Sequence, residues 1–275
     1  MPMDDLLVYT LLSRGYKGQA LDNSSNSVFY RAPFEKNNQP VTPEDALLNP
    51  ETIINWELGF KQRFAHKGFL RANVFVSEVT DLQLASYDGN TTSFRFINAG
   101  SVRSQGVEMA LQWMLVDGLL LHLAGSYIDA YYLSFTGAPC QVSQQMAGTC
   151  SAQMGGQDLS GKKVNETPPW QWVAQVDYTY ALSAGEIHAQ IDFQYQDSFI
   201  FDVDQDKQTE QSAFGLVHLA LDFMHYQGVG MGIFINNLFD EYHAERIIDA
   251  PIFQGAYQLY PGEGRRVGLS FQYDY

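Results

Sequence analysis

Long apolar runs are absent from this 275-residue sequence, and none approaches the ~18 residues that a membrane-spanning helix requires. The mean hydropathy of −0.20 would suggest a soluble protein, but barrel strands interleave polar with apolar residues and dilute the hydrophobic signal. Basic residues are also scarce, with 16 Lys and Arg against 31 Asp and Glu. The net charge of −15 argues against nucleic acid or an anionic membrane surface as a partner.

Cysteine is nearly absent, with Cys140 and Cys150 as the two representatives in a polar, glycine-containing stretch. Two unrelated thiols are one interpretation. The ten-residue separation favours a disulfide that closes a loop, which implies an oxidising compartment outside the cytoplasm.

The first residues, Met1–Asp5, lack the basic and apolar regions of a signal peptide. A chain with the features of an extracytoplasmic protein thus begins without an export signal. The simplest interpretation is that this chain is a piece of a longer protein.

Motifs of common enzymes are missing as well. There is no Gly-x-Ser-x-Gly elbow, no His-Glu-x-x-His and no cysteine pair at zinc-ligand spacing, and the glycine-rich Gly228–Gly232 continues into a predicted strand. His188 with Asp192, and His218 with Asp222, are ~13 Å apart along one strand, too far to ligate one ion. A metal or proton-relay site made from residues of neighbouring strands stays possible, but a hydrated lumen lined with polar side chains explains these residues better. We expect no catalytic residue, no bound metal and no cofactor.

Strict alternation of apolar and polar residues is what the sequence does contain. From Val267 to Tyr275 the apolar residues occupy every second position, and a period of two indicates a β-strand with unlike faces. A sustained 3.6-residue period is found nowhere, so the fold class is all-β. The fourth strand is long, and we expect a bulge near Gly100. Ten strands are predicted, at 6–16, 55–61, 70–87, 93–115, 119–127, 170–180, 187–196, 217–223, 229–235 and 267–275.

The connections between these strands alternate between short and longer ones. In an up-and-down barrel every second connection lies on the same rim, so one rim has tight turns and the other has loops. A Greek-key sandwich has no reason to sort its connections this way. The pattern therefore predicts an antiparallel, up-and-down transmembrane β-barrel. In chain order the connections are 17–51, 67–68, 88–92, 117–118, 136–167, 183–185, 202–212, 227–228 and 249–255.

Aromatic residues are predicted at both ends of the apolar strand faces. In the strand at 170–180, the Trp pair precedes the Tyr pair by eight residues, which covers about 20 Å along the membrane normal at ~3.3 Å per residue and ~40° tilt. Trp and Tyr favour a membrane interface because their rings have an apolar body and a polar end. An aromatic-rich soluble core is the alternative. The predicted interface residues are Trp170, Trp172, Tyr178, Tyr180, Tyr273 and Tyr275, with Phe199 and Phe201 joining the upper belt.

Five stretches resemble the C-terminal barrel of TonB-dependent outer-membrane receptors. Together they cover nearly the whole chain in the order found in that family, and the combination is specific. They are Gly15–Gly18 before a long loop, Leu48–Thr52 running into Trp56–Lys61, Asn98–Gly100 with Ser104–Glu108, Asn236–Tyr242, and the last strand with its aromatic end.

The resemblance implies TonB-energised uptake of a ligand such as a ferric siderophore across the bacterial outer membrane, rather than enzymatic activity. It implies four partners: outer-membrane lipid, the TonB complex through an N-terminal part, the barrel-assembly machinery through the C-terminal strand, and the ligand. Members of the family have a plug domain ahead of a barrel of about 22 strands. Plug and signal peptide are absent here, so residues 1–275 are expected to form the C-terminal portion of such a barrel.

Two alternatives remain open at this point. One is a self-closed small outer-membrane barrel that acts as a pore or a membrane enzyme. The other is a soluble secreted β-protein that binds carbohydrate.

Ligand recognition would lie at the rim with the long loops, because loops on a rigid scaffold carry recognition. Aromatic side chains there could contact a ligand, or each could pack against a neighbouring loop. Because loop residues that select a ligand follow no general spacing rule, the sequence does not identify the ligand. The candidate contacts are Tyr30, Phe34, Tyr132, Phe135 and Phe253.

Overall fold

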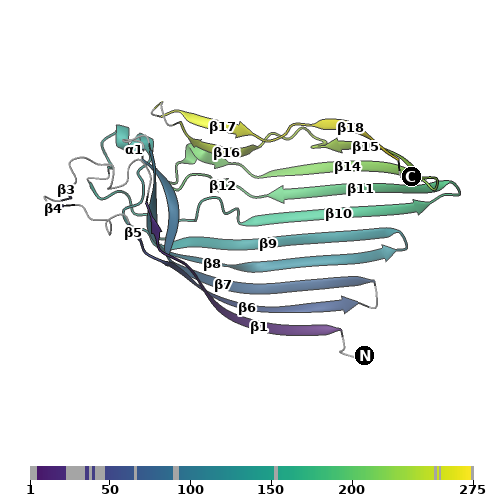
Figure 1. Cartoon of the computed structure of the whole chain (residues 1–275), viewed down its shortest axis with the longest axis horizontal. Helices are drawn as coiled ribbons and strands as arrows, with labels where there is room; N and C mark the ends of the chain where they lie inside the picture. Colours follow the sequence, from purple (N-terminus) through teal and green to yellow (C-terminus); the bar gives the residue numbers. More distant parts are fainter. Residues whose placement is uncertain are drawn as a thin grey trace.

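One antiparallel sheet of ten strands makes up most of the protein (Figure 1). Its strands follow the order of the chain, so each is hydrogen-bonded to the strands that precede and follow it in the sheet. They are β1 (Leu6–Lys17), β6 (Glu51–Phe64), β7 (Gly68–Asp88), β8 (Ser93–Val116), β9 (Leu119–Ser134), β10 (Trp170–Ala181), β11 (Gly185–Gln196), β14 (Phe214–His225), β15 (Val229–Asn236) and β18 (Arg266–Tyr273).

The computed structural model describes residues 5–22, 35–36, 39–40, 47–64, 67–88, 93–151, 154–250, 253 and 255–273. Within these ranges, the structure contains no helix with the length and apolar character needed to cross a membrane.

The order of the strands confirms the predicted all-β, up-and-down arrangement, and all ten predicted strands are present. A register shift between Ser101 and Val102, where β8 pairs with β9, confirms the irregularity expected near Gly100. Strand ends are less well predicted, because β9 continues to Ser134 and places Tyr132 on a strand instead of in a loop.

The prediction that the last connection between sheet strands lies at 249–255 is wrong. β15 ends at Asn236 and β18 begins at Arg266, so the connection is much longer. It contains an extra hairpin of β16 (Ala244–Asp249) and β17 (Tyr257–Pro261), and the predicted connection runs in the sequence from the end of β16 toward the start of β17. A hairpin turn and a rim turn have the same composition, so the sequence pattern does not separate them.

Strand register gives the sheet one apolar and one polar face. Trp172 of β10 lies opposite Gly125 of β9 and Tyr195 of β11, while the neighbouring Gln171 lies opposite Ser126 and Gln196 on the other face. Side chains alternate along each strand, so an unshifted register keeps the apolar residues of all strands together. The apolar face, on which Trp172 lies, is a broad exposed band. It includes Leu58, Val74, Val107, Ile191, Phe193, Leu221, Ile233 and Leu269.

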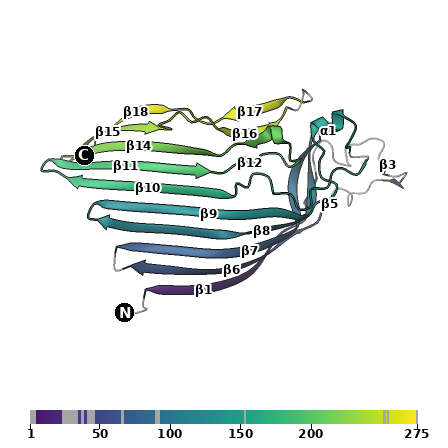
Figure 2. The ribbon, with the colours of Figure 1, turned by 180° about the vertical axis from the view of Figure 1, so that it is seen from behind.

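Tight turns gather at one end of the sheet and longer connections at the other (Figures 1 and 2). β8 and β9 are joined through Asp117 and Gly118, and β10 and β11 through residues 182–184. Gly118 has φ +80° and a Cβ there would lie 2.4 Å from the Thr179 carbonyl oxygen, so this turn requires glycine. The sorting of connections predicted from the sequence is confirmed.

The loop end is itself partly structured. Tyr132 and Phe135 are almost fully buried in one apolar cluster, and Phe201 packs with Ala244 and Ile247 in a second. Cys140 and Cys150 form a disulfide in the β9–β10 connection. The short elements are the pairs β2 (Ala20–Leu21) with β5 (Leu47–Leu48), β3 (Glu35–Lys36) with β4 (Gln39–Pro40) and β12 (Phe199–Ile200) with β13 (Glu210–Gln211), the helix α1 (Val142–Met146) and the 3₁₀ turn η4 (Lys207–Thr209).

Gly125 of β9 makes room for an indole ring on the apolar face. A Cβ at this position would lie 2.2 Å from Cε3 of Trp172, which is directly opposite in β10. Trp172 in turn stacks on Trp170, with ring centres 5.8 Å apart. The small residue in β9 therefore fixes the position of an aromatic pair at the surface of the sheet.

Gly125→Val is expected to lower the free energy of unfolding by about 1–3 kcal/mol, because the added side chain overlaps the Trp172 ring. Gly18→Val is the matched control, since no atom lies within 4 Å of a Cβ at Gly18. Urea denaturation of both variants in detergent micelles, followed by tryptophan fluorescence, measures the difference. Equal stability of the two variants would contradict this packing role.

Candidate functional site

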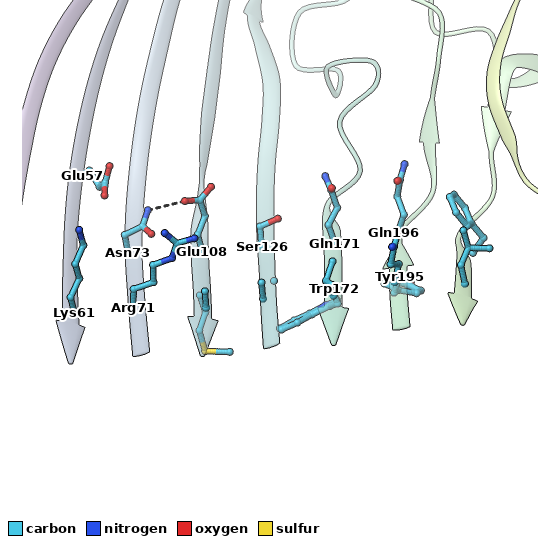
Figure 3. A pocket seen from close by; sticks show the side chains of 18 of the residues that line it. Glu57, Lys61, Arg71, Asn73, Glu108, Ser126, Gln171, Trp172, Tyr195 and Gln196 are labelled. Carbon is cyan, nitrogen blue, oxygen red and sulfur yellow. Dashed lines mark hydrogen bonds between the residues drawn. The ribbon is translucent and has the colours of Figure 1, made fainter. Parts of the chain in front are cut away.

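The polar face of the sheet is hollowed. A cavity of about 670 Å³ lies on this face and is lined by residues from β1 to β14 and by His243 of the connection between β15 and β16. Because a flat sheet cannot surround a cavity, the polar face is the concave one, and Figure 3 shows its side chains in a row across neighbouring strands. The polar residues that line it are Tyr9, Glu57, Lys61, Arg71, Asn73, Glu108, Ser126, Gln171, Gln194, Gln196 and His243.

Hydrogen bonds and mixed charges hold these side chains in place. The Tyr9 hydroxyl donates to Oε1 of Glu57, and Nζ of Lys61 lies 5.6 Å from the centre of the Tyr9 ring. Nδ2 of Asn73 donates to Oε2 of Glu108 at 3.2 Å (Figure 3). Amides, hydroxyls and charges of both signs form a wall that can hydrogen-bond to water, to a polar solute or to a polar protein surface.

The two histidine–aspartate pairs are brought together across strands, not along them. His188 lies opposite Asp222, and Asp192 lies opposite His218, where β11 pairs with β14. Nδ1 of His188 is 3.1 Å from Oγ1 of Thr179, and Nδ1 of His218 accepts the N–H of Asn237 at 3.3 Å. These side chains therefore belong to the polar wall, where each histidine has a local hydrogen-bond partner.

The predicted interface aromatics lie in pairs on the apolar face. Trp170 and Trp172 stack near the loop end of β10, and Tyr178 and Tyr180 lie near its tight-turn end with ring centres 6.2 Å apart. All four are between 37% and 51% exposed, and Tyr273 is 67% exposed. The structure thus presents them at the surface, while their contact with lipid stays a prediction. Tyr275 lies outside the described residues.

The prediction that Phe201 joins the upper belt of membrane-interface aromatics is wrong. This ring is 8% exposed and contacts Phe199 at 4.7 Å between ring centres, inside the second loop cluster. β11 ends at Gln196, so both phenylalanines belong to a loop hairpin and not to a strand that faces outward.

Of the predicted ligand contacts, the structure buries two and exposes one. Tyr132 is 0% and Phe135 1% exposed, so neither ring presents a surface to a ligand, because both fill the first loop cluster. Phe253 is 70% exposed. Tyr30 and Phe34 lie outside the described residues.

A buried group of acidic residues at the loop end was missed by the sequence analysis. Asp204, Asp206 and Asp249 are each less than 10% exposed, and the Tyr257 hydroxyl donates to Oδ2 of Asp206 at 2.7 Å. Burial, and then the neighbouring charge of Asp202, raises the pKa of Asp204 to about 8. The spacing Asp-x-Asp-x-Asp at 202–206 was the available signal, but the approach of Asp249 from another hairpin was not visible in the sequence.

Comparisons with known proteins agree with this geometry. Residues 1–238 match the family described as "TonB dependent receptor-like, beta-barrel". The ferric yersiniabactin uptake receptor FyuA from Yersinia pestis is similar in structure, with a TM-score of 0.73 and 20% identity, over 100% of this chain and 36% of that one. The siderophore receptor PiuA from Acinetobacter baumannii has a TM-score of 0.66 and 18% identity over 100% of this chain and 34% of its own.

A third structure, the ferric preacinetobactin receptor BauA from Acinetobacter baumannii, has a TM-score of 0.65 and 14% identity, over 99% of this chain and 35% of that one. The chain thus spans about a third of the length of these receptors. No curated protein sequence matches it.

The chain belongs to the TonB-dependent receptor-like β-barrel family. Its ten-stranded antiparallel sheet corresponds to part of such a barrel, and the barrels of this family belong to the bacterial outer membrane.

The raised pKa of Asp204 predicts a loop end that is more stable in acid than in mild alkali. A carboxyl with a raised pKa binds more protons in the folded than in the unfolded state. Its stabilising contribution is fully present below the unfolded value of 3.8 and is lost as the pH rises through about 8. Asp204→Asn removes the charge and keeps an acceptor for the Asp206 N–H, so we expect slower proteolysis of the loops above pH 8 than in the wild type.

Limited proteolysis across this pH range, followed by mass spectrometry of the loop cleavages, measures the effect. Asp158→Asn is the control, because hydrogen bonds from Ser160 lower the pKa of Asp158 and its removal should give no gain in alkali. Identical pH profiles for Asp204→Asn and the wild type would refute the assignment.

Proposed function

We propose that the chain is the C-terminal part of the barrel wall of a TonB-dependent outer-membrane receptor. The single observation that supports this most is the sheet itself, in which ten consecutive strands carry one exposed apolar face and one concave polar face. An apolar face of this breadth suits lipid, and a polar concave face suits a hydrated lumen. The aromatic pairs of β10 then mark the two membrane interfaces.

The barrel is completed by further strands. β1 and β18 lie at opposite edges of the sheet, and among the described residues neither has a second partner strand within it. Unpaired backbone groups are not tolerated in lipid, so both edges require neighbours. This favours a wall segment of a larger barrel over a self-closed barrel of ten strands. The barrel-assembly machinery would recognise β18, with its aromatic residues on the lipid side.

The transported ligand is proposed to be a ferric siderophore or a similar scarce solute. FyuA and PiuA, which the chain resembles in fold, are named as receptors of this kind. Capture would begin at the loop end, where Phe253 offers an exposed ring and where Tyr30 and Phe34 stay candidate contacts. The TonB complex would act through an N-terminal plug, and the polar wall around Glu57 and Glu108 would face that plug and the lumen.

Uptake of ⁵⁵Fe from the organism's own iron-limited culture supernatant tests the proposal. We expect uptake to be lost when the gene is deleted, and also when a protonophore removes the energy source of TonB. Ser126→Trp, which projects a large side chain from the polar wall, should reduce uptake toward the deletion level. Leu121→Trp, on the lipid-facing side of the same strand, is the matched control and should retain uptake.

Unchanged uptake in the deletion strain would contradict a receptor function for this ligand class. Uptake that survives the protonophore would instead contradict energised transport. Immunoblots of the outer-membrane fraction confirm that both tryptophan variants are present in equal amounts.

A further inference from the structure

A second cavity lies where the β16–β17 hairpin is attached to the sheet. It measures about 490 Å³, and its walls come from β11, β14, the end of β15, the start of β16 and the segment before β18. It adjoins the larger hollow of the polar face, with which it shares Gln194, Leu216 and His243. Figure 1 shows the hairpin at the loop end, beyond the ends of β15 and β18.

His218 of β14 lines this cavity and holds the turn that follows β15. Its Nδ1 accepts the backbone N–H of Asn237 at 3.3 Å, and beside it the N–H of Leu238 donates to the Val217 carbonyl at 2.8 Å. A nitrogen that accepts an N–H must offer a lone pair, so Nδ1 carries no proton in this arrangement. Protonation of Nδ1 would place two donors face to face and break the hydrogen bond.

Asn237 connects His218 to both ends of the hairpin. The residue is 3% exposed, and its Nδ2 donates to the carbonyl oxygens of Glu241 at 2.9 Å and of Glu263 at 3.1 Å. Its Oδ1 accepts the N–H of Glu241 at 2.8 Å. Glu241 lies in the connection that leads into β16, and Glu263 lies in the connection that follows β17. One buried side chain therefore fixes both connections, and its own backbone N–H is fixed by His218.

Asp192 offers a partner to a charged His218 ring. It lies directly opposite His218 where β11 pairs with β14, and it lines the same cavity. Its Oδ2 accepts from Nε2 of Gln190 at 2.8 Å, which leaves the other carboxylate oxygen for a second donor. A protonated ring that turns away from Asn237 can thus form a charge-assisted hydrogen bond with β11.

The remaining titratable groups of the cavity lie on the hairpin side. His243 stacks on Phe214 with ring centres 4.7 Å apart, and Glu263 forms an ion pair with Arg266. Glu245 also lines the cavity. The carboxylates around His218 therefore come from β11, from β16 and from the β17–β18 connection, and they favour a positive ring over a neutral one once Nδ1 is released.

We propose that protonation of His218 releases the β16–β17 hairpin from the sheet. At neutral pH the uncharged ring accepts the Asn237 N–H and the hairpin stays attached. In acid the ring takes up a proton and turns toward Asp192, and the Asn237 N–H loses its acceptor. The attached form holds the neutral ring and the released form the charged one, so a fall in pH shifts the balance toward release. This inference goes beyond the proposed uptake, because it requires only the folded loop end.

Hydrogen–deuterium exchange of the detergent-solubilised, full-length receptor is the test. The range from about pH 7.5 to about pH 5 covers the ordinary titration of histidine, and measured rates are corrected for intrinsic exchange at each pH. We expect the amides of residues 237–243 to exchange about tenfold faster in acid, because leaving a buried N–H unpaired costs a factor of that order. Equal corrected rates at the two ends of the range would overturn the proposal.

The segment at residues 202–206 is the internal reference, because the burial of Asp204 predicts that acid stabilises it. If that segment also exchanges faster in acid, the loop end loosens as a whole and the assignment to His218 is overturned.

Variants assign the pH dependence to His218. His218→Asn keeps an acceptor near the position of Nδ1 and cannot be protonated at these pH values, so we expect slow exchange throughout. Asp192→Asn is the second test if His218→Asn does not fold, and release should then require a lower pH. His122→Asn, which changes a histidine near Asp177 elsewhere on the polar wall, is the control and should follow the wild type. Acid-dependent exchange in folded His218→Asn, or a wild-type profile in Asp192→Asn, would overturn the proposal.

Discussion

Backbone hydrogen bonding between neighbouring strands is the constraint on which the rest of this structure depends. A strand in lipid has no water to satisfy its N–H and C=O groups, so each must pair with the strands beside it. The register from β1 through β18 meets this requirement for ten strands in chain order. Because the register is nearly unshifted, every strand turns its apolar residues to the same side. The outer edges of β1 and β18 are where the requirement is not met within the sheet, and this supports a larger barrel.

The loop end follows from a different balance of forces. Its segments gain stability from small clusters, such as the one in which Tyr132 and Phe135 pack with Leu159 of the β9–β10 connection and with residues of β7 and β8. The Cys140–Cys150 disulfide limits the unfolded conformations of the longest described connection. Within this compact region, carboxylates such as Asp204 and Asp249 are buried with like charges nearby, which raises their pKa values. A buried carboxylate is costly to keep charged, so the stability of the loop end depends on pH.

The strands were predictable from the sequence because their signal is local. Alternation from Trp170 to Tyr180 depends only on residues within one strand, and the structure places that strand where the pattern does. The loop end was not predictable in the same way, since burial there depends on residues far apart in the chain. Tyr132 is covered by Leu159 and Val203, and Asp249 reaches Asp202 from a separate hairpin. The polar wall was predicted as a lumen surface, but its hollow depends on the curvature of the sheet.

The central claim is that this chain forms one part of a larger receptor barrel in the outer membrane. It is tested most directly by an immunoblot of the outer-membrane fraction with antibody to this chain, comparing boiled and unboiled samples. The account predicts a band well above the 31.0 kDa of the chain that shifts on boiling, as a stable membrane barrel does when it unfolds. A heat-shifting band at 31.0 kDa would mean a self-closed small barrel and would contradict it.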